Sequence, residues 1–305
     1  MGTPDFAVPS LDILIKHGYD ISAVVTAPDK PAGRGQLLNE SPVKKYALAA
    51  NIPVLQPEKL KAPDFIEKLK SFNANLQIVV AFRMLPEIVW QMPENGTFNL
   101  HASLLPQYRG AAPINWAVIN GETETGLTTF FLQHEIDTGD IILQEKLPIG
   151  PDETAGGLHD RMSIAGAELV LKTVKKIEAN NIKTQKQILA QDIKTAPKIF
   201  KDDCRIDWNK PLNELHNFIR GLSPYPTAWT TFDSKVFKIY KTAKEYSGYQ
   251  GEYGLVFTDK KTFLKVGVKG GFLHLLEIQT EGKKRVKANE FLNGFRGENG
   301  ISKLY

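Results

Sequence analysis

The spacing of apolar segments in the first half of the chain constrains the fold more than any other feature. Short runs rich in β-branched and aromatic residues alternate with segments whose apolar residues recur at helical spacing. The runs that we predict as strands cover residues 21–27, 76–82, 96–100, 127–132 and 141–145. Because strands that alternate with helices are typical of parallel sheets with crossover helices, we predict an α/β domain with a mainly parallel sheet.

The second part of the chain has a different pattern. A long helix is predicted from Thr154 to Ile177, and the polar residues 181–199 are interpreted as a linker between domains 1–180 and 200–305. A helix at 212–222 then precedes short predicted strands separated by Gly and Lys pairs, at 236–240, 254–258, 263–268 and 272–278. Short strands of this kind favour a small antiparallel barrel.

Charge is divided unevenly between these parts. Residues 1–199 contain 20 Lys and Arg against 22 Asp and Glu, whereas residues 200–305 contain 18 against 12. A basic domain is typical of proteins that bind a polyanion, because neutralised phosphates contribute most of the sequence-independent affinity for nucleic acid. A solvated basic surface is the alternative explanation.

Composition excludes several classes of protein. The 305 residues, 42% of them hydrophobic, are typical of a globular chain of about two domains. No apolar run approaches the roughly 18 residues that a membrane span needs, and no signal segment is recognised, so we expect a cytoplasmic protein without a membrane partner. The single cysteine, Cys204, excludes an intramolecular disulfide and a thiol-rich metal site, and we expect it to pack in the core.

The run FNLHASLLP at residues 98–106 is the first candidate for chemistry. In an extended strand alternate side chains point to opposite faces, so Leu100 faces the core while Asn99 and His101 lie about 7 Å apart on the other face. A histidine transfers protons near neutral pH, and an asparagine amide can stabilise an oxyanion. The pair suits acyl transfer; a core histidine beside a capping asparagine is the alternative.

The turn DTGD at residues 137–140 is the second candidate. We expect a positive φ at Gly139, and a turn that carries Asp137 over the end of the sheet. A carboxylate beside a histidine raises the basicity of the imidazole or relays a proton itself. A solvated acidic turn is the alternative.

A loop rich in Pro and Gly at residues 27–36 is the third candidate. It carries Lys30 and Arg34, and an arginine there can reach a phosphate or a base edge. The sequence contains neither the GxxxxGK[ST] pattern nor a GxGxxG after a strand, so no dinucleotide cofactor is indicated.

Together these motifs resemble the folate-dependent formyltransferase family. The resemblance rests on NxHASLLP from Asn99, YRGAAPI from Tyr108 and DTGD from Asp137. The segments MGTPDFAVPSL at the start, PDKPAGRG from Pro28 and RIDW from Arg205 make it similar to members that formylate initiator tRNA. Such a chain has a Rossmann-like formyltransferase domain followed by a basic OB-like domain that binds tRNA.

The resemblance implies that the α-amine of initiator methionyl-tRNA attacks the formyl carbon of 10-formyltetrahydrofolate, a cosubstrate, without a metal. It implies catalytic roles for Asn99, His101 and Asp137, and contacts with tRNA for Lys30 and Arg34. Folate-binding roles fall on Phe82, Arg83, Met84, Leu85, Ser103, Leu104, Leu105 and Pro106. We expect a monomer.

The sequence departs from the family at three points. Relatives begin with an apolar strand before Gly-Thr-Pro, whereas this sequence starts at Met1, so we expect the first strand of the sheet to be missing. The acidic run before DTGD is shorter, at residues 133–136. Phe82 and Arg83 replace Tyr-Gly, and Arg83 either pairs with a ligand or turns to solvent.

Other functions are compatible with the same three side chains. Formylation of an amino-sugar nucleotide and hydrolysis of 10-formyltetrahydrofolate stay open, while the second domain disfavours formylation of glycinamide ribonucleotide. A catalytically silent RNA-binding protein is the alternative from another class. It would have no need for Asn99, His101 and Asp137 together.

Overall fold

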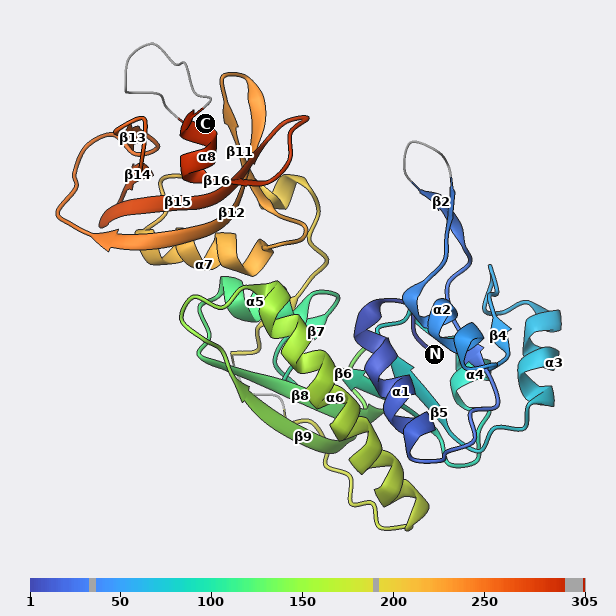
Figure 1. Cartoon of the computed structure of the whole chain (residues 1–305). Helices are drawn as coiled ribbons and strands as arrows, with labels where there is room; N and C mark the ends of the chain where they lie inside the picture. Colours follow the sequence, from blue (N-terminus) through green and yellow to red (C-terminus); the bar gives the residue numbers. More distant parts are fainter. Residues whose placement is uncertain (33–36, 189–191, 294–303, 305) are drawn as a thin grey trace. The chain divides into compact units, whose positions relative to one another are not determined.

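The chain folds into two compact units. Figure 1 shows the computed structural model, which describes residues 1–32, 37–188, 192–293 and 304. The first unit comprises Met1–Gly110, Thr125–Leu147 and His159–Thr195, and the second comprises Ala111–Glu124, Pro148–Leu158 and Ala196–Tyr305.

The first unit contains most of the strands predicted in the first half of the chain. Its elements, three of which begin or end in the second unit, are η1 (Asp5–Ala7), α1 (Val8–Lys16), β1 (Val24–Val25), β2 (Lys30–Ala32), β3 (Leu37–Asn39), α2 (Pro42–Ala49), β4 (Val54–Leu55), α3 (Pro63–Ser71), β5 (Gln77–Val80), α4 (Glu87–Trp90), β6 (Thr97–His101), β7 (Arg109–Gly110), β8 (Glu124–Phe131), β9 (Ile141–Pro148) and α6 (Ala155–Glu178).

The sheet of the first unit is parallel on one side and antiparallel on the other. Strand β1 pairs in parallel with β4, and β5 pairs in parallel with β6. Strand β8 is antiparallel to β6, with His101 opposite Thr128. The chain leaves β6 at His101 and re-enters the sheet in β8 at the same end, so β8 runs back along β6.

Met1 and Gly2 lie between β1 and β5. The N–H of Gly2 donates to the carbonyl of Val25 at 3.1 Å, and the N–H of Val80 donates to the carbonyl of Met1 at 2.9 Å. Beside these two residues is a cavity of about 610 Å³. Its lining includes residues of α1, the segment that leads into β1, and the segment that leads into β5. The short N-terminal segment therefore connects β1 and β5 over only part of their length.

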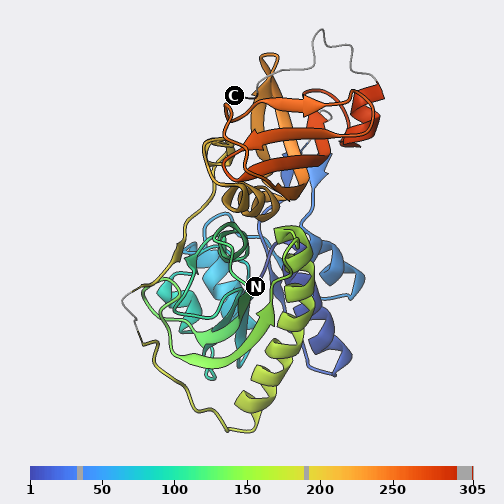
Figure 2. The same ribbon diagram turned by 90° about the vertical axis from the view of Figure 1, so that its left-hand side faces the viewer.

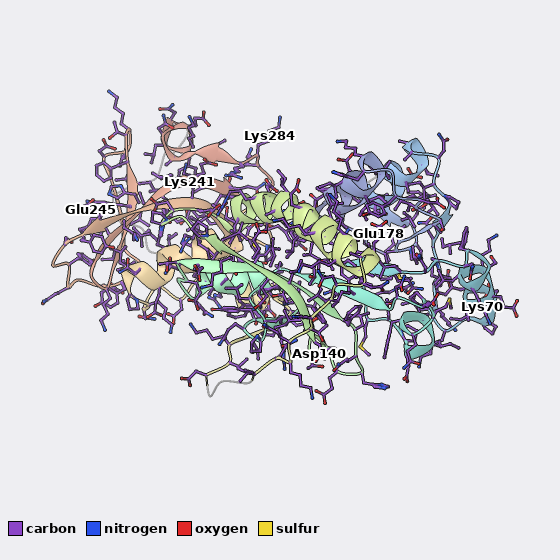
Figure 3. All side chains as sticks on the ribbon, turned by 90° about the horizontal axis from the view of Figure 1, so that it is seen from below. Lys70, Asp140, Glu178, Lys241, Glu245 and Lys284 are labelled. Carbon is purple, nitrogen blue, oxygen red and sulfur yellow. The ribbon has the colours of Figure 1, made fainter. Side chains whose placement is uncertain are left out.

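Helix α6 covers one face of the sheet, as Figure 2 shows. Gly166 lets the helix approach β6, because a Cβ at this position would lie 2.7 Å from the Leu100 side chain. Figure 3 labels Glu178 at the end of the helix, where its carboxylate accepts a 3.0 Å hydrogen bond from the Tyr19 hydroxyl. A separate apolar cluster that includes Phe65 and Val79 packs α3 and α4 against β1 and β5.

The second unit is an antiparallel β domain. Its elements are α5 (Pro113–Ile119), β10 (Thr195–Ala196, which starts in the first unit), η2 (Asp202–Cys204), α7 (Leu212–Leu222), β11 (Ala228–Phe232), β12 (Lys235–Tyr246), β13 (Val256–Thr258), β14 (Leu264–Val268), β15 (Gly271–Thr280), β16 (Val286–Lys287) and α8 (Ala288–Asn293). The strand order is β11-β12-β15-β14-β13, with β16 also paired to β15. The bounds predicted for α7 are confirmed, while β11 and β16 were not predicted.

The core of the second unit lies between α7 and this sheet. It includes Trp208, Leu215, Ile239 and Leu273. Cys204 belongs to the same core, and its thiol donates to the carbonyl of Phe200, so the packing role predicted for it is confirmed. Both parts of the predicted fold class are present: an α/β domain with parallel strands and an antiparallel β domain.

Within the described residues, no helix has both the length and the apolar character that crossing a membrane requires.

Candidate functional site

The candidate site lies where β5 and β6 end. In parallel strands the carboxyl ends meet at one edge of the sheet, and loops that follow them lie close together. The loop at 82–85 follows β5 and the loop at 102–108 follows β6. Two of the segments with predicted binding roles therefore start from neighbouring strands.

Strand β6 presents its side chains as predicted. Phe98 and Leu100 are buried, and Leu100 packs against α6. Asn99 is half-buried and His101 is buried on the opposite face of the strand. Among the described residues, the side-chain amide of Asn99 makes no hydrogen bond, so its donors are free to meet a ligand.

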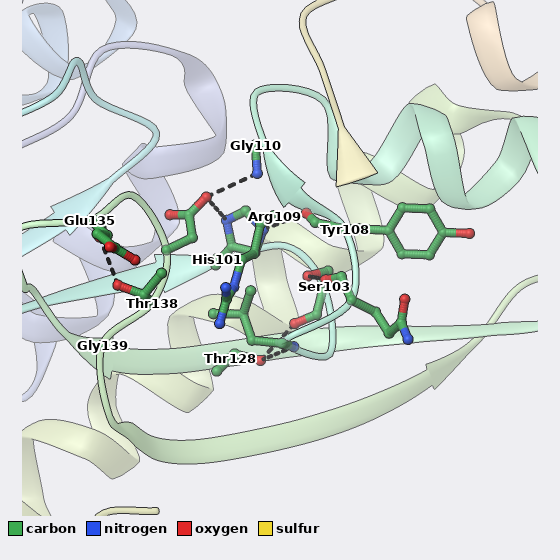
Figure 4. A network of polar contacts seen from close by, with 12 residues as sticks. His101, Ser103, Tyr108, Arg109, Gly110, Thr128, Glu135, Thr138 and Gly139 are labelled. Atoms are coloured by element: carbon green, nitrogen blue, oxygen red, sulfur yellow. Dashed lines mark hydrogen bonds and ion pairs between the residues drawn. The ribbon is translucent and has the colours of Figure 1, made fainter. Parts of the chain in front are cut away.

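His101 lies between a backbone carbonyl and a carboxylate (Figure 4). Its Nε2 is 2.9 Å from the carbonyl oxygen of Tyr108. Because a carbonyl only accepts hydrogen bonds, Nε2 carries a proton. Its Nδ1 is 3.8 Å from Oδ2 of Asp137, and the two side chains are only 7% and 13% exposed. The structure thus brings together two residues from distant parts of the sequence.

Asp137 is held from the other side by Gly110. The backbone N–H of Gly110 donates to Oδ2 of Asp137 at 3.0 Å. A charge-assisted bond of this kind fixes the carboxylate oxygen that faces His101. Glu135 accepts a 3.0 Å hydrogen bond from the Thr138 hydroxyl within the same loop, as Figure 4 shows.

The expectation of a positive φ at Gly139 is wrong. The positive φ in this turn is at Asp137, where it is 56°. Gly139 is needed for a different reason, because a Cβ at this position would lie 1.7 Å from the carbonyl oxygen of Phe131. The glycine therefore allows the turn to pass close to the end of β8.

The segment 103–106 is fixed by Thr128. The Thr128 hydroxyl donates to the carbonyl of Ser103 at 2.6 Å and accepts from the N–H of Leu105 at 3.1 Å. The Nε2 of Gln144 donates to the carbonyl of Leu105 at 2.9 Å. Ser103 and Leu105 are buried, whereas Leu104 and Pro106 are half-buried. The first pair can act on a ligand only through the backbone, and the second pair can also offer side chains.

Arg83 is exposed, and its guanidinium is held by backbone carbonyls. Its guanidinium donates to the carbonyl of Glu58 at 2.8 Å and to the carbonyl of Pro57. It thereby joins the loop after β5 to residues 57–58. Phe82 is half-buried beneath it, Leu85 is buried in the apolar cluster, and the Met84 side chain is 71% exposed.

The loop with the predicted tRNA contacts is only partly described. Lys30 is exposed at the start of β2, and Arg34 lies outside the described residues. At the base of this hairpin, Asp29 accepts hydrogen bonds from Lys44 and from Gln56, the latter at 2.8 Å. The bond from Lys44, followed by the bond from Gln56, holds the pKa of the Asp29 carboxyl below its usual value.

Two residues that the sequence did not indicate also belong to the site. Gln187 donates hydrogen bonds to backbone carbonyls of the Asp137 turn, and Arg109 donates to Gln187. Gln187 lies in the polar stretch interpreted as a linker, and no pattern there distinguishes it from its neighbours. Arg109 lies inside a recognised motif, but its type and spacing did not indicate a partner.

The described residues contain no group of three or more His, Cys, Asp or Glu side chains arranged to hold a metal ion.

Comparison with known proteins identifies the family of this chain. A family profile described as formyl transferase matches residues 1–174, and one described as formyl transferase, C-terminal domain, matches residues 198–296. A protein from Bacteroides thetaiotaomicron named methionyl-tRNA formyltransferase is 54% identical over 308 residues, which cover 98% of this chain and 96% of that protein. A protein of the same name from Flavobacterium johnsoniae is 54% identical over 298 residues, with coverages of 96% and 94%.

Solved structures of lower identity share the fold. WlaRD, a sugar 3N-formyl transferase, has a TM-score of 0.66 at 24% identity over 93% of this chain and 97% of its own. An N-formyltransferase from Helicobacter canadensis has a TM-score of 0.65 at 23% identity, with coverages of 92% and 97%. From the two profiles and the near full-length relatives, the chain belongs to the formyl transferase family.

Proposed function

We propose that this chain transfers the formyl group of 10-formyltetrahydrofolate to the α-amine of initiator methionyl-tRNA. The observation that carries the proposal is the pairing of His101 with Asp137, beside the free amide of Asn99, in a chain 54% identical to a protein named methionyl-tRNA formyltransferase. The product, formylmethionyl-tRNA, is used in translation initiation, so the proposed substrates are cytoplasmic.

The reaction moves one carbon between two nitrogens. The lone pair of the methionyl amine attacks the formyl carbon and forms a new C–N bond, while the formyl oxygen becomes an oxyanion. The bond between the formyl carbon and N10 of the folate then breaks, and N10 takes a proton as it leaves. The amine loses a proton, so the site must stabilise an oxyanion and move one proton.

Asn99 and His101 are the oxyanion donors in this proposal. They lie on one face of β6, at the edge of the sheet where loops from neighbouring strands meet. The Asn99 amide donates without changing its charge, and a protonated Nδ1 of His101 can donate from beside it. One preorganised donor of this kind typically contributes about 100- to 1000-fold in rate.

Asp137 is the proton relay. Its Oδ2 is 3.8 Å from Nδ1 of His101, which is longer than a hydrogen bond, so a proton passes between them through a water or after a small approach. The carboxylate accepts the proton that the amine loses and passes it to N10 of the folate as the bond between N10 and the formyl carbon breaks. General acid–base catalysis of this type contributes about 100- to 10,000-fold.

The folate is proposed to lie against the loops at 82–85 and 103–106. Two structural relatives support a folate cosubstrate, since WlaRD was solved with 5-N-formyl-THF and HypX from Aquifex aeolicus with tetrahydrofolic acid. Arg83 then shapes the pocket from its place on residues 57–58, without a direct contact to the ligand.

The tRNA is proposed to contact residues 27–36, which include Lys30 and Arg34, and the second unit. The excess of basic residues in 200–305 supports the second contact, because it favours binding of a phosphate backbone. We propose that the monomer is the active form.

A formyl-transfer assay tests the proposal. Purified protein is incubated with 10-formyltetrahydrofolate and initiator methionyl-tRNA, and formylmethionine is quantified after the ester is hydrolysed. Parallel reactions contain an amino-sugar nucleotide, or no acceptor so that hydrolysis is measured. We expect product only with the tRNA. Formylation of the sugar nucleotide, or acceptor-independent loss of the formyl group at the same rate, would replace the proposal.

A further inference from the structure

The segment that follows α6 lies along the candidate site. Gln185 exchanges two backbone hydrogen bonds with Ile141 at the start of β9, with N–O distances of 2.8 and 2.9 Å. Further along, the N–H of Tyr108 donates to the carbonyl of Lys194, and the N–H of Lys194 donates to the side chain of Gln107 at 2.9 Å. These bonds attach the segment to both loops that flank His101 and Asp137.

The side chain of Gln187 uses its whole amide in this contact. Its Nε2 donates to the carbonyl of Asp137 at 2.9 Å and to the carbonyl of Gly139 at 2.8 Å. Its Oε1 accepts from Nε of Arg109 at 3.1 Å and from Nη2 at 2.5 Å. The orientation of the amide is fixed, because carbonyls only accept and a guanidinium only donates.

The backbone to which the Gln187 side chain donates hydrogen bonds has an uncommon conformation. Asp137 has a φ of 56°, a region that residues other than glycine rarely adopt. Such a conformation persists only where surrounding contacts hold it. The carbonyl of Asp137 is held by Gln187, and the carboxylate of the same residue is held by Gly110.

Arg109 connects Gln187 and Gly110, the two residues that hold Asp137. It precedes Gly110 in the chain, so the residue that orients Gln187 is the neighbour of the one that binds the Asp137 carboxylate. A shift of Gln187 therefore acts on Asp137 in two ways: through the backbone carbonyl of Asp137, and through the loop at 109–110.

We infer that Gln187, oriented by Arg109, is a positioning residue that sets the distance between Asp137 and His101. The inference rests on the proposed function. Gln187 acts through Asp137 and does not itself touch the reacting atoms. A displacement of about 1 Å at a catalytic group can cost about 100-fold in rate, so loss of this contact lowers turnover rather than substrate binding.

Two substitutions and one matched control test the inference. Gln187→Ala removes the amide, and Gln187→Glu keeps its size but replaces both donors with an oxygen that faces two carbonyls. The control is Gln185→Ala, because Gln185 is exposed, lies in the same segment and is attached through its backbone. We expect kcat to fall about 10- to 100-fold in both Gln187 variants, with the KM of each substrate and the Tm unchanged, and no change in the control.

A second comparison separates positioning from a general structural role. In an Asp137→Asn background, Gln187→Ala should cause no further loss of kcat, because the group that it positions no longer functions. A full additional loss in the double variant, or wild-type kcat in Gln187→Ala, would overturn the inference.

Hydrogen–deuterium exchange tests the contact without any activity. The backbone amides of residues 132–140 should exchange faster in Gln187→Ala than in wild type or in Gln185→Ala. If wild type fails to formylate methionyl-tRNA, the proposed function fails, and faster exchange still supports the positioning contact. Unchanged exchange at 132–140 would overturn it in either case.

Discussion

The backbone N–H of Gly110 binds the same carboxylate oxygen of Asp137 that faces Nδ1 of His101. One oxygen is therefore shared between a fixed donor and the imidazole. An asparagine at position 137 could keep an oxygen toward Gly110 while losing the negative charge. This separates the structural role of the side chain from its role in proton transfer.

Asp137→Asn should lower kcat by about 100- to 10,000-fold, because the amide cannot accept the proton that the amine loses. Folate binding should be nearly unchanged, since the turn keeps its hydrogen bond to Gly110. Turnover is measured by formyl transfer to methionyl-tRNA and binding by titration with tetrahydrofolate. Wild-type turnover in this variant would remove Asp137 from the mechanism.

Gly139→Ala should disturb the turn that carries Asp137. The added Cβ would lie 1.7 Å from the carbonyl of Phe131, so the backbone must move. We expect a stability loss of about 1–3 kcal/mol and a clear fall in kcat. Gly18→Ala is the comparison, since nothing lies within 4 Å of a Cβ built at Gly18. The positive φ of Gly18 makes this substitution destabilising as well, but without a close contact. If Gly139→Ala retains full turnover, the close approach to Phe131 is not required.

Arg34→Ala should raise the KM for methionyl-tRNA about 10-fold, which corresponds to the loss of one charge-assisted hydrogen bond to a phosphate or a base. The KM for the folate should not change. Arg34 lies outside the described residues, so this prediction comes from the sequence. Lys70→Ala, at an exposed lysine on α3, controls for the loss of one positive charge. Equal tRNA KM values in the two variants would contradict a specific role for Arg34.

His216 should make the second unit less stable in mild acid. Burial, and then the charge of Lys244, lower the pKa of His216, although Asp152 opposes this from 3.0 Å. The unfolded chain, with a histidine pKa near 6.5, therefore binds a proton more readily than the folded chain. Stability is fully present above about pH 6.5 and decreases as the pH falls below it, by at most about 1.4 kcal/mol per pH unit.

His216→Gln should remove this part of the pH dependence. Urea unfolding at pH 7.5 and pH 5.0, followed by tryptophan fluorescence, gives the free energy of unfolding of each protein. His17→Gln is the control, because His17 is exposed. A pH dependence that is the same in both variants would show that another group is responsible.

The sequence predicted the parts of the fold that depend on periodic patterns. Helix α7 and most strands of both units occur where apolar residues recur at regular spacing. The sequence did not indicate the direction of β8, because strand direction depends on the path between strands, which local pattern does not record. Strand β16 has only two residues, which is too few to show a period.

The candidate site was predictable to a similar extent. Asn99 and His101 were recognisable from alternation along one strand, and Asp137 from a turn motif. Gln187 was not recognisable, because its role comes from four hydrogen bonds to residues distant in the sequence. The positive φ was assigned to Gly139 by residue type, whereas in the structure it falls at Asp137.

The hydrogen bonds of Gln187 have a consequence for any attempt to isolate the catalytic part of this protein. A truncated domain that stops at the end of α6 would retain Asn99, His101 and Asp137, and would still contain the whole region matched by the first family profile. It would nevertheless lack Gln187, whose amide binds the backbone of the turn that carries Asp137. The smallest independently active fragment should therefore extend past α6, to at least residue 194.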